Sequence, residues 1–181
     1  LSHAVRQQSG LLKTALPHLE RLSEEVGETV KLTILQGKEV IVLYYIKGSS
    51  KMQISTDVGN QLPLHAGAAS KVLLSSLSDL EIREFASAGL KRYTDSTITD
   101  TSALIAAIHE VRERGFAVDD QEYMSGVAAI AAPLRDFTGS IVAALSIAYF
   151  AAENGPAKHN ALLSSLLSAT RRISTELGMS R

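Results

Sequence analysis

Residues 40–46 form a run in which every side chain is apolar or aromatic. Successive side chains of a strand point to opposite faces of a sheet, so this run places apolar groups on both faces. One face takes Val40, Val42, Tyr44 and Ile46, and the other takes Ile41, Leu43 and Tyr45. A strand of this kind must be covered on both sides. We therefore expect a sheet with helices packed on each face.

The order of helical and extended patterns indicates the fold class. Pro17 suits the first turn of a helix, and Gly27 and Gly115 suit helix ends. The patterns predict a hairpin over 29–36 and 40–46, a loop over 47–64 with a short extended piece near 53–55, strands over 116–123, 127–135 and 141–149, and helices over 16–26, 65–76, 78–88, 101–114 and from 156. Strands and helices come in separate runs, which favours an α+β fold with an antiparallel sheet over a doubly wound parallel one.

The composition excludes several classes of protein. No cysteine is present, which removes disulfide scaffolds and Cys-ligated zinc. The 18 Lys+Arg nearly balance the 19 Asp+Glu, so these residues lack the basic footprint of a free-standing nucleic-acid binder. The longest apolar run, 141–152, is well short of the ~20 residues that span a membrane. We expect a cytoplasmic protein without membrane contact.

The second hairpin carries unusually small side chains on one face. These are Val127, Ala129 and Ala131 on one strand and Val142, Ala144, Ser146 and Ala148 on the next. The other face of the last strand carries the large side chains of Ile141, Leu145, Ile147 and Tyr149, which suit a packed core. The small face either leaves room for a ligand pocket or lets a helix approach closely, and both interpretations stay open.

Three further patterns bear on chemistry. The segment 59–71 leads into a helix whose exposed first amides could attract a small carboxylate, although a close-packed helix start explains its small residues equally well. The acidic run 119–122 lacks the spacing of a calcium loop, and the five histidines show no paired ligand spacing, so no metal site is predicted. Ser70, His65 and Asp119 are hydrolase residue types without a nucleophile elbow, so no catalytic residue is predicted.

Two segments together resemble one family. They are 59–71, GNQLPLHAGAASK, and 115–136, which begins GFAVDDQE and ends AAPLRD. Between them, residues 93–98 (YTDSTI) fit the paired threonines of the family. The order and spacing of these motifs are similar to those of the effector-binding domain of IclR-type bacterial transcriptional regulators, over about residues 16–178.

This resemblance implies a GAF-like fold, with a curved antiparallel sheet between helices and a pocket for a small metabolite. Relatives carry a winged helix-turn-helix domain ahead of this region, joined by a linker helix. Residues 1–15 are then a linker helix or connector, residues 16–181 are the effector-binding domain, and DNA is contacted only by an upstream domain outside this chain. The resemblance also implies a homodimer or homotetramer that needs no cofactor.

The ligand-contacting positions of the family correspond to Ile54, Leu62, Ala68, Ala69, Asp119, Ala129, Ser146 and Ala148. Ser70 stands where the family usually has Gly, and Ala129 and Ala148 occupy positions that are more polar in some relatives. These differences imply a less polar or larger effector.

We expect a small organic acid whose carboxylate meets the amides near Ala68 and Ala69, while Ser146 and Asp119 address a hydroxyl or keto group. Binding would regulate transcription by favouring one arrangement of the subunits. Two other functions stay open. One is a hydrolase or transferase that uses the same pocket, and the other is a pure oligomerisation module in which protein side chains fill the small face.

Overall fold

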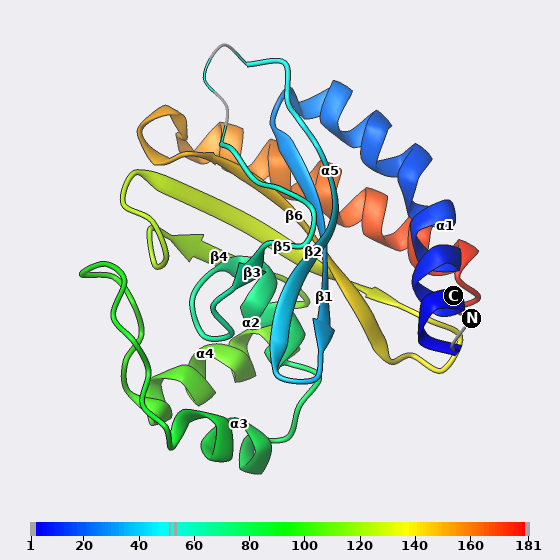
Figure 1. The fold of residues 1–181 in the computed structure, drawn as a ribbon. Coiled ribbons are helices and arrows are strands. Elements are labelled where there is room, and N and C mark those ends of the chain that lie inside the picture. The colour runs from blue at the N-terminus through cyan, green and yellow to red at the C-terminus, as the bar shows by residue number, and fades with distance from the viewer. Residues whose placement is uncertain (1–2, 51, 53, 180–181) are drawn as a thin grey trace.

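The computed structural model describes residues 3–50, 52 and 54–179, with side chains from residue 6 onward. Figure 1 shows the arrangement of the elements. In chain order they are α1 (His3–Val26), β1 (Thr29–Gln36), β2 (Glu39–Ile46), β3 (Gln61–Leu62), α2 (Ala68–Leu74), α3 (Asp79–Ala86), α4 (Thr101–Arg114), β4 (Ala117–Asp120), β5 (Val127–Arg135), β6 (Ile141–Phe150), a short 3-10 turn (Ala151–Glu153) and α5 (Pro156–Glu176).

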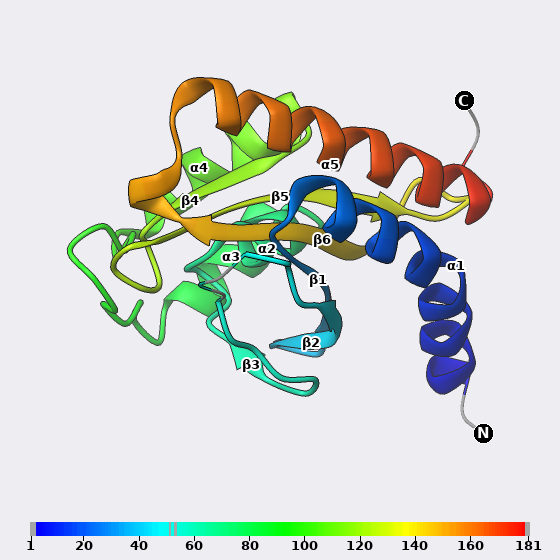
Figure 2. The same cartoon turned by 90° about the horizontal axis from the view of Figure 1, so that it is seen from above.

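The strands form one antiparallel sheet in the order β3-β2-β1-β6-β5-β4. The hairpins β1–β2 and β5–β6 meet where β1 pairs with β6, at the centre of the sheet. Figure 2 shows that the sheet curves, with β2 and β3 turned away from α5. Helices α1 and α5 lie side by side on one face, and α2 packs on the other with α3 and α4 beyond it. The predicted α+β fold, with a curved antiparallel sheet and helices on both faces, is confirmed.

The sheet separates two cores that differ in side-chain size. Toward α1 and α5, the last strand contributes the fully buried side chains of Leu145, Ile147 and Tyr149. Toward α2 and α4, the central strands contribute Ala131 and Ala144. The size contrast expected from the sequence is present, and the small face is the one on which α2 packs.

A β-bulge corrects the alternation predicted for 40–46. The register between β1 and β2 shifts between Leu32 and Thr33, so one extra residue enters β2. Beyond such a bulge the side chains change face, because the period of a strand is two. Tyr44 and Ile46 therefore pack toward α1 and α5, whereas Val40 packs toward α2. Both faces are apolar as expected, but the strict assignment of residues to faces was wrong.

The same correction applies at the start of β6. The register of β5 and β6 shifts between Leu134 and Arg135. As a result Ile141 packs on the α2 side and Val142 on the α1 side, the reverse of the expected assignment. Neither bulge is marked in the sequence by a glycine or a proline, which is why simple alternation missed both.

Helix α1 is continuous across the helix start predicted at residue 16. Pro17 lies inside the helix rather than in its first turn. An interior proline removes one backbone hydrogen bond and crowds the carbonyl four residues earlier. Figure 2 shows α1 bending along its length. The buried contacts of Leu11, Leu19 and Leu22 with the core offset that loss.

Helix α2 is shorter than the predicted 65–76. Gly67 has a φ of +109°, which lies outside the α-helical region, so the helix begins only after it. Helix α4 agrees with its predicted bounds, with Asp100 capping its start and Gly115 ending it at a φ of 78°. The extended piece predicted near 53–55 is not a strand at residues 54–55, and residue 53 lies outside the described residues. The edge strand is β3 instead.

Candidate functional site

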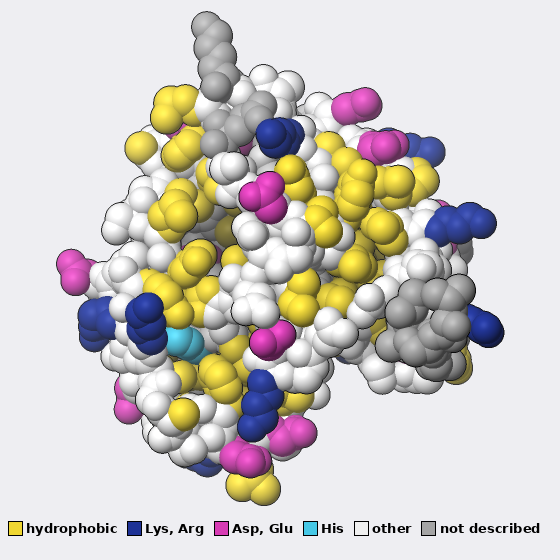
Figure 3. Space-filling view, viewed as in Figure 1, with side chains coloured by type: hydrophobic (Ala, Val, Ile, Leu, Met, Phe, Trp, Pro, Cys, Tyr) yellow, Lys and Arg dark blue, Asp and Glu magenta, His cyan; other side chains and the backbone are white. Residues whose placement is uncertain are grey.

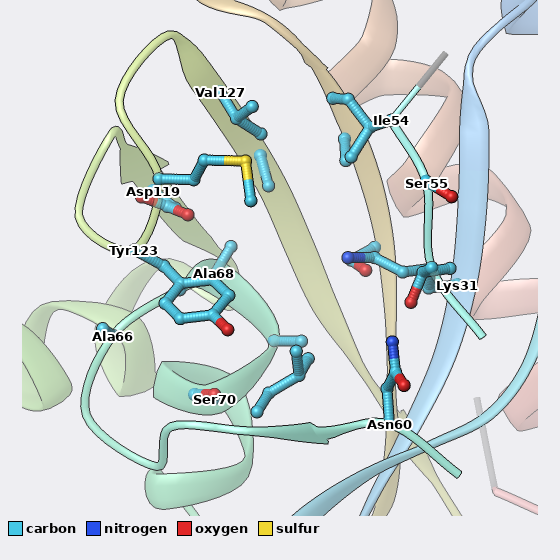
Figure 4. A pocket seen from close by; sticks show the side chains of 18 of the residues that line it. Lys31, Ile54, Ser55, Asn60, Ala66, Ala68, Ser70, Asp119, Tyr123 and Val127 are labelled. Atoms are coloured by element: carbon cyan, nitrogen blue, oxygen red, sulfur yellow. The ribbon is translucent and has the colours of Figure 1, made fainter. Parts of the chain in front are cut away.

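A cavity of about 200 Å³ lies between the small face of the sheet and the start of α2 (Figure 4). A cavity of about 150 Å³ can hold benzene, so this one suits a small metabolite. All eight predicted ligand-binding residues line it: Ile54, Leu62, Ala68, Ala69, Asp119, Ala129, Ser146 and Ala148. The structure therefore brings together residues from the loop before β3, α2, β4, β5 and β6.

Small side chains on the sheet keep this cavity open. Ala129 pairs with Ala148 across β5 and β6, and Ala131 pairs with Ser146 one step along the same face. Ala129, Ala131 and Ala148 all belong to the core beneath α2, and Ala129, Ser146 and Ala148 also line the cavity. The small face thus lets α2 pack closely and also leaves a cavity beside it. The side chains of the described residues do not fill the space beside Ala129 and Ser146.

Asp119 enters the cavity from β4 and is 5% exposed. Its Oδ1 accepts a hydrogen bond of 2.7 Å from the backbone N–H of Glu122, while its Oδ2 lies on the side of Gly67. Burial raises the pKa of Asp119 to about 6, and the negative charge of Glu122 acts in the same direction. The hydrogen bond from Glu122 and the charges of Lys71 and Lys31 oppose that rise. Asp119 is therefore an acceptor whose charge changes close to neutral pH.

Lys31 also lines the cavity, and the sequence patterns did not single it out. It lies on β1, where its backbone pairs with β2 and β6, and its side-chain ammonium forms no hydrogen bond or ion pair with any residue that the structure describes. Burial lowers the pKa of its ammonium group, and the charge of Asp119 opposes that effect. The sequence contains one pattern that could have indicated Lys31. Lys31 and Thr33 alternate with the buried Val30 and Leu32 in β1, which the structure shows to be a central strand.

Ser146 lies directly opposite Lys31 in the register of β1 and β6. Its side chain is 1% exposed, and its Oγ has no hydrogen-bond partner within the described part of the chain. A buried hydroxyl without a partner costs free energy. Lys31 and Ser146 thus present two neighbouring donor groups to the cavity without an acceptor.

The start of α2 forms the wall opposite the sheet. No side chain caps its first amides. The N–H of Lys71 donates a hydrogen bond to Gly67 O, the residue before the helix. Ser70, which replaces the glycine common in the family, donates a hydrogen bond of 2.5 Å to Pro63 O. That bond ties α2 to the chain leading into it, so this departure from the family pattern has a structural explanation.

A buried network fixes the loop that follows Asp119. Lys71 of α2 forms an ion pair with Glu122 and donates to Val118 O at 2.5 Å. Thr97 Oγ1 donates to Glu122 O at 2.6 Å and accepts the N–H of Thr94 at 2.8 Å. Because Glu122 N–H also binds Asp119, this network joins α2 and the threonine loop to the cavity wall.

The hydrolase residue types do not form a catalytic arrangement. His65 Nε2 lies 2.8 Å from Lys91 O, and its ring centroid is 5.8 Å from that of Tyr93. Ser70 donates to Pro63 rather than to His65. Tyr93 in turn packs edge-on against Tyr123 at 5.1 Å, and Tyr123 lines the cavity. His65 therefore supports the wall of the cavity.

A more open groove of about 730 Å³ runs between α1 and the turns of the two hairpins, beside Leu11 and the 76% exposed Phe137. Within the described ranges, no cluster of three His, Cys, Asp or Glu side chains could hold a metal ion. No helix among the described residues has the length and apolar character to span a membrane.

A curved antiparallel sheet that encloses a small cavity with unpartnered polar groups beneath a short helix defines a ligand-binding domain. Residues 3–175 match the family model described as the C-terminal region of the bacterial transcriptional regulator IclR. The chain therefore belongs to the IclR family, as its motifs indicated.

Individual relatives agree with this assignment. The chain is 33% identical over 172 residues to the regulator BhcR of Paracoccus denitrificans, covering 94% of this chain and 62% of that protein. It is 35% identical over 138 residues to the repressor AllR of Escherichia coli K12, covering 76% of this chain and 51% of that protein. These matches are to regulators, so the chain is placed among them and not among enzymes. It spans only part of the length of either relative.

Solved structures agree with the fold. The Thermotoga maritima IclR superposes with a TM-score of 0.86 at 28% identity, covering 93% of this chain and 68% of that one. The C-terminal domain of Escherichia coli KdgR superposes with a TM-score of 0.83 at 29% identity, covering 93% of this chain and 98% of that one. The GAF-like fold expected from the resemblance is confirmed.

Proposed function

We propose that this chain is the effector-binding domain of a transcriptional regulator and that a small organic acid binds in its cavity. The observation that carries the proposal is the cavity of about 200 Å³ with Lys31, Ser146 and Asp119 in its wall. Ser146 lacks a partner within the described residues, and a ligand with acceptor atoms would supply one. The eight residues expected from the family to contact ligand all line this space.

The arrangement of the whole regulator is part of the proposal. Residues 1–15 serve as the linker helix or connector that joins residues 16–181 to an upstream winged helix-turn-helix domain, and only that domain contacts DNA, in the cytoplasm. Support comes from the continuous helix α1, whose first turns project from the body of the molecule (Figure 2). Both relatives are described as HTH-type regulators and are longer than the matched region.

Control of transcription would require differential affinity. A ligand shifts an equilibrium between subunit arrangements only if it binds one arrangement more tightly than the other. We propose that homodimers or homotetramers provide those arrangements. Figure 3 shows apolar side chains gathered on the face where β2 and α1 meet, which would suit a contact between subunits.

A thermal-shift screen of small organic acids tests the proposed function. The panel covers glyoxylate, pyruvate, sugar acids, short hydroxy acids and hydroxybenzoates. A ligand at 100 times its dissociation constant adds roughly 2.7 kcal/mol to the free energy of unfolding. We expect at least one acid to stabilise the wild-type chain and to leave Ala68→Trp unchanged, because the indole ring would occupy the cavity.

Ala103→Trp is the matched control, because Ala103 is exposed on α4 and its indole would lie outside the cavity. Ala129→Leu provides a second blocked cavity if Ala68→Trp folds poorly. If no acid stabilises the wild type, or if stabilisation persists in both blocked variants, the cavity is not the effector site.

A further inference from the structure

We propose that Lys31 and Ser146 bind the anionic end of the effector and that Asp119 binds a hydrogen-bond donor at its other end. The effector class is then a short carboxylate that carries a hydroxyl group. This inference rests on the proposed function and deepens it by assigning an orientation and a charge-selective residue. It also departs from the expectation that the amides near Ala68 and Ala69 receive the carboxylate.

Lys31, which is partly buried, differs from the buried Lys71. Lys71 is paired with Glu122, and its ammonium also donates to the carbonyl of Val118. Lys31 has neither kind of partner among the described residues, although it lies on a central strand inside the cavity. A buried charge is usually paired because removing it from water is costly. An anionic ligand would provide the missing partner.

Ser146 extends the same binding surface. It is the register partner of Lys31, and side chains directly opposite each other on antiparallel strands have Cβ atoms about 4.5–5.5 Å apart. Its Oγ is buried, lines the cavity and has no partner in the described part of the chain. A carboxylate has two oxygens, so it can accept hydrogen bonds from an ammonium and a neighbouring hydroxyl together.

Asp119 defines the opposite end of the cavity. Figure 4 shows Lys31 and Asp119 entering the cavity from opposite sides. Strands β6 and β5 separate Lys31 on β1 from Asp119 on β4. Their opposite charges act on each other across the cavity without a direct ion pair between the two side chains. The row of Asp119 carries Ala129 and Ala148, and the row of Lys31 carries Ser146 and Ala131. Only small side chains therefore rise from β5 and β6 between the two charged groups. A ligand of a few carbon atoms would fill that gap.

The two ends require different ligand groups. A carboxylate placed beside Asp119 would meet a like charge, which lowers affinity or forces a proton onto one of the pair. A hydroxyl group can instead donate to Asp119. Helix α2 has seven residues and offers backbone donors, and its one charged side chain, Lys71, is already paired with Glu122. Lys31 is therefore the group able to distinguish an anion from its neutral analogue.

The test compares matched compounds by isothermal titration. Hydroxy acids of two to six carbon atoms are each compared with their neutral amide and with the same acid lacking the hydroxyl. On the wild type we expect one hydroxy acid to bind more tightly than both analogues. In Lys31→Met its affinity should fall about 10- to 100-fold, as expected for the loss of a charged hydrogen bond, while that of the amide changes little. Lys31→Arg should retain the preference for acid.

Lys38→Met is the matched control, because Lys38 is exposed in the turn of the same hairpin. Lys31→Met should fold, since it removes a partly buried charge that has no ion-pair partner among the described residues, and its thermal midpoint checks this. Equal binding of acid and amide to the wild type overturns the inference, as does an acid preference that survives in Lys31→Met. The thermal-shift screen separates this inference from the proposed function. If an acid stabilises the wild type but not the blocked-cavity variants, the proposed function stands even where one of these two results overturns the role of Lys31.

Discussion

At the scale of single residues, the cavity concentrates groups that the fold alone does not need. Asp119 is buried and Lys31 partly buried in its wall, and Ser146 adds a buried hydroxyl without a partner among the described residues. Each costs stability in the empty protein, because burial disfavours charges and unpaired polar groups. Sites of this kind commonly trade stability for function.

The cost of burying the Asp119 carboxylate should appear in the free energy of unfolding of Asp119→Asn, compared with that of the wild type at two pH values. The folded state raises the pKa of Asp119 from 3.8 to about 6, mainly through burial, so the folded chain holds this proton more tightly than the unfolded chain. The resulting stabilisation is present at low pH and is lost as the pH rises through about 6. Asp119→Asn should be more stable than wild type by about 1–3 kcal/mol near pH 7.5 and about equal near pH 4.

Urea unfolding of both chains at the two pH values measures this difference. Asp120→Asn is the matched control, because Asp120 is the exposed neighbour on the same strand. A variant that is less stable than the wild type near pH 7.5 would show that the ionised carboxylate stabilises the fold.

Thr97→Val should loosen the cavity wall. Thr97 Oγ1 donates to Glu122 O and accepts from the N–H groups of Tyr93 and Thr94. Valine keeps the shape but removes all three hydrogen bonds, and Glu122 O keeps only the 3.3 Å bond from Thr94 Oγ1, so we expect a cost of about 1–3 kcal/mol. Thermal unfolding checks this against Thr99→Val, which alters an exposed threonine. Equal stability of the two variants would contradict the role given to this network.

At the scale of elements, the course of the chain before α2 shapes the cavity. Gly67 holds a positive φ and lies beside Asp119, so the chain reaches the helix by a path that only glycine adopts easily. The first amides of α2 then point away from any side-chain cap. A longer helix starting at residue 65 would occupy part of the space that the cavity now takes.

Gly67→Ala and Gly10→Ala should have opposite effects. A Cβ at Gly67 has room, but its φ of +109° is strained for alanine, so we expect a loss of about 1 kcal/mol or more. Gly10 lies in α1 with nothing near its Cβ position, where alanine should add about 0.5–1 kcal/mol. Chemical denaturation measures both. A stabilising Gly67→Ala would mean that the path before α2 is not constrained.

Much of the element order could be predicted from the sequence, and the misses have physical causes. The bounds of α4 and β5 agree because a cap, a terminal glycine and clear periodicity mark them. The bulges in β2 and β6 were missed because they depend on pairing between strands rather than on local residues. The helix start predicted from Pro17 was wrong. The local preference of proline for a first helical turn is outweighed by the packing of α1 against the core, so the helix continues across Pro17.

The candidate site was also predicted only in part. Motif resemblance indicated the eight expected positions, and the small face of β5 and β6 indicated a space beside three of them. Lys31 was missed because its role depends on β1 lying next to β6, and only the topology shows that pairing. A lone lysine among apolar residues gives no sign of which strand will lie beside it.

At the scale of the whole molecule, the two faces of the sheet have different roles. The face toward α1 and α5 is a core of large side chains, while the other face combines the packing of α2 with the cavity. Since β1 and β6 contribute to both faces, a ligand bound to Lys31 and Ser146 would act on β1, which packs against α1, and on β6, which packs against α5. This gives the cavity a physical connection to the proposed linker helix.

Self-association of this chain is the expectation at this scale. The apolar face beside β2 and α1 (Figure 3) would be buried in a dimer. Light scattering should therefore give two or four times the mass of one chain at micromolar concentration. The mass of a single chain across the concentration range would mean that this domain does not assemble the regulator.

A crystal structure with the acid that stabilises the chain most tests the central claim directly. We predict that the ligand lies in the cavity with its carboxylate at Lys31 and Ser146 and its hydroxyl at Asp119. A ligand found in the open groove beside α1, with the cavity unchanged, would contradict the claim that this cavity is the effector site.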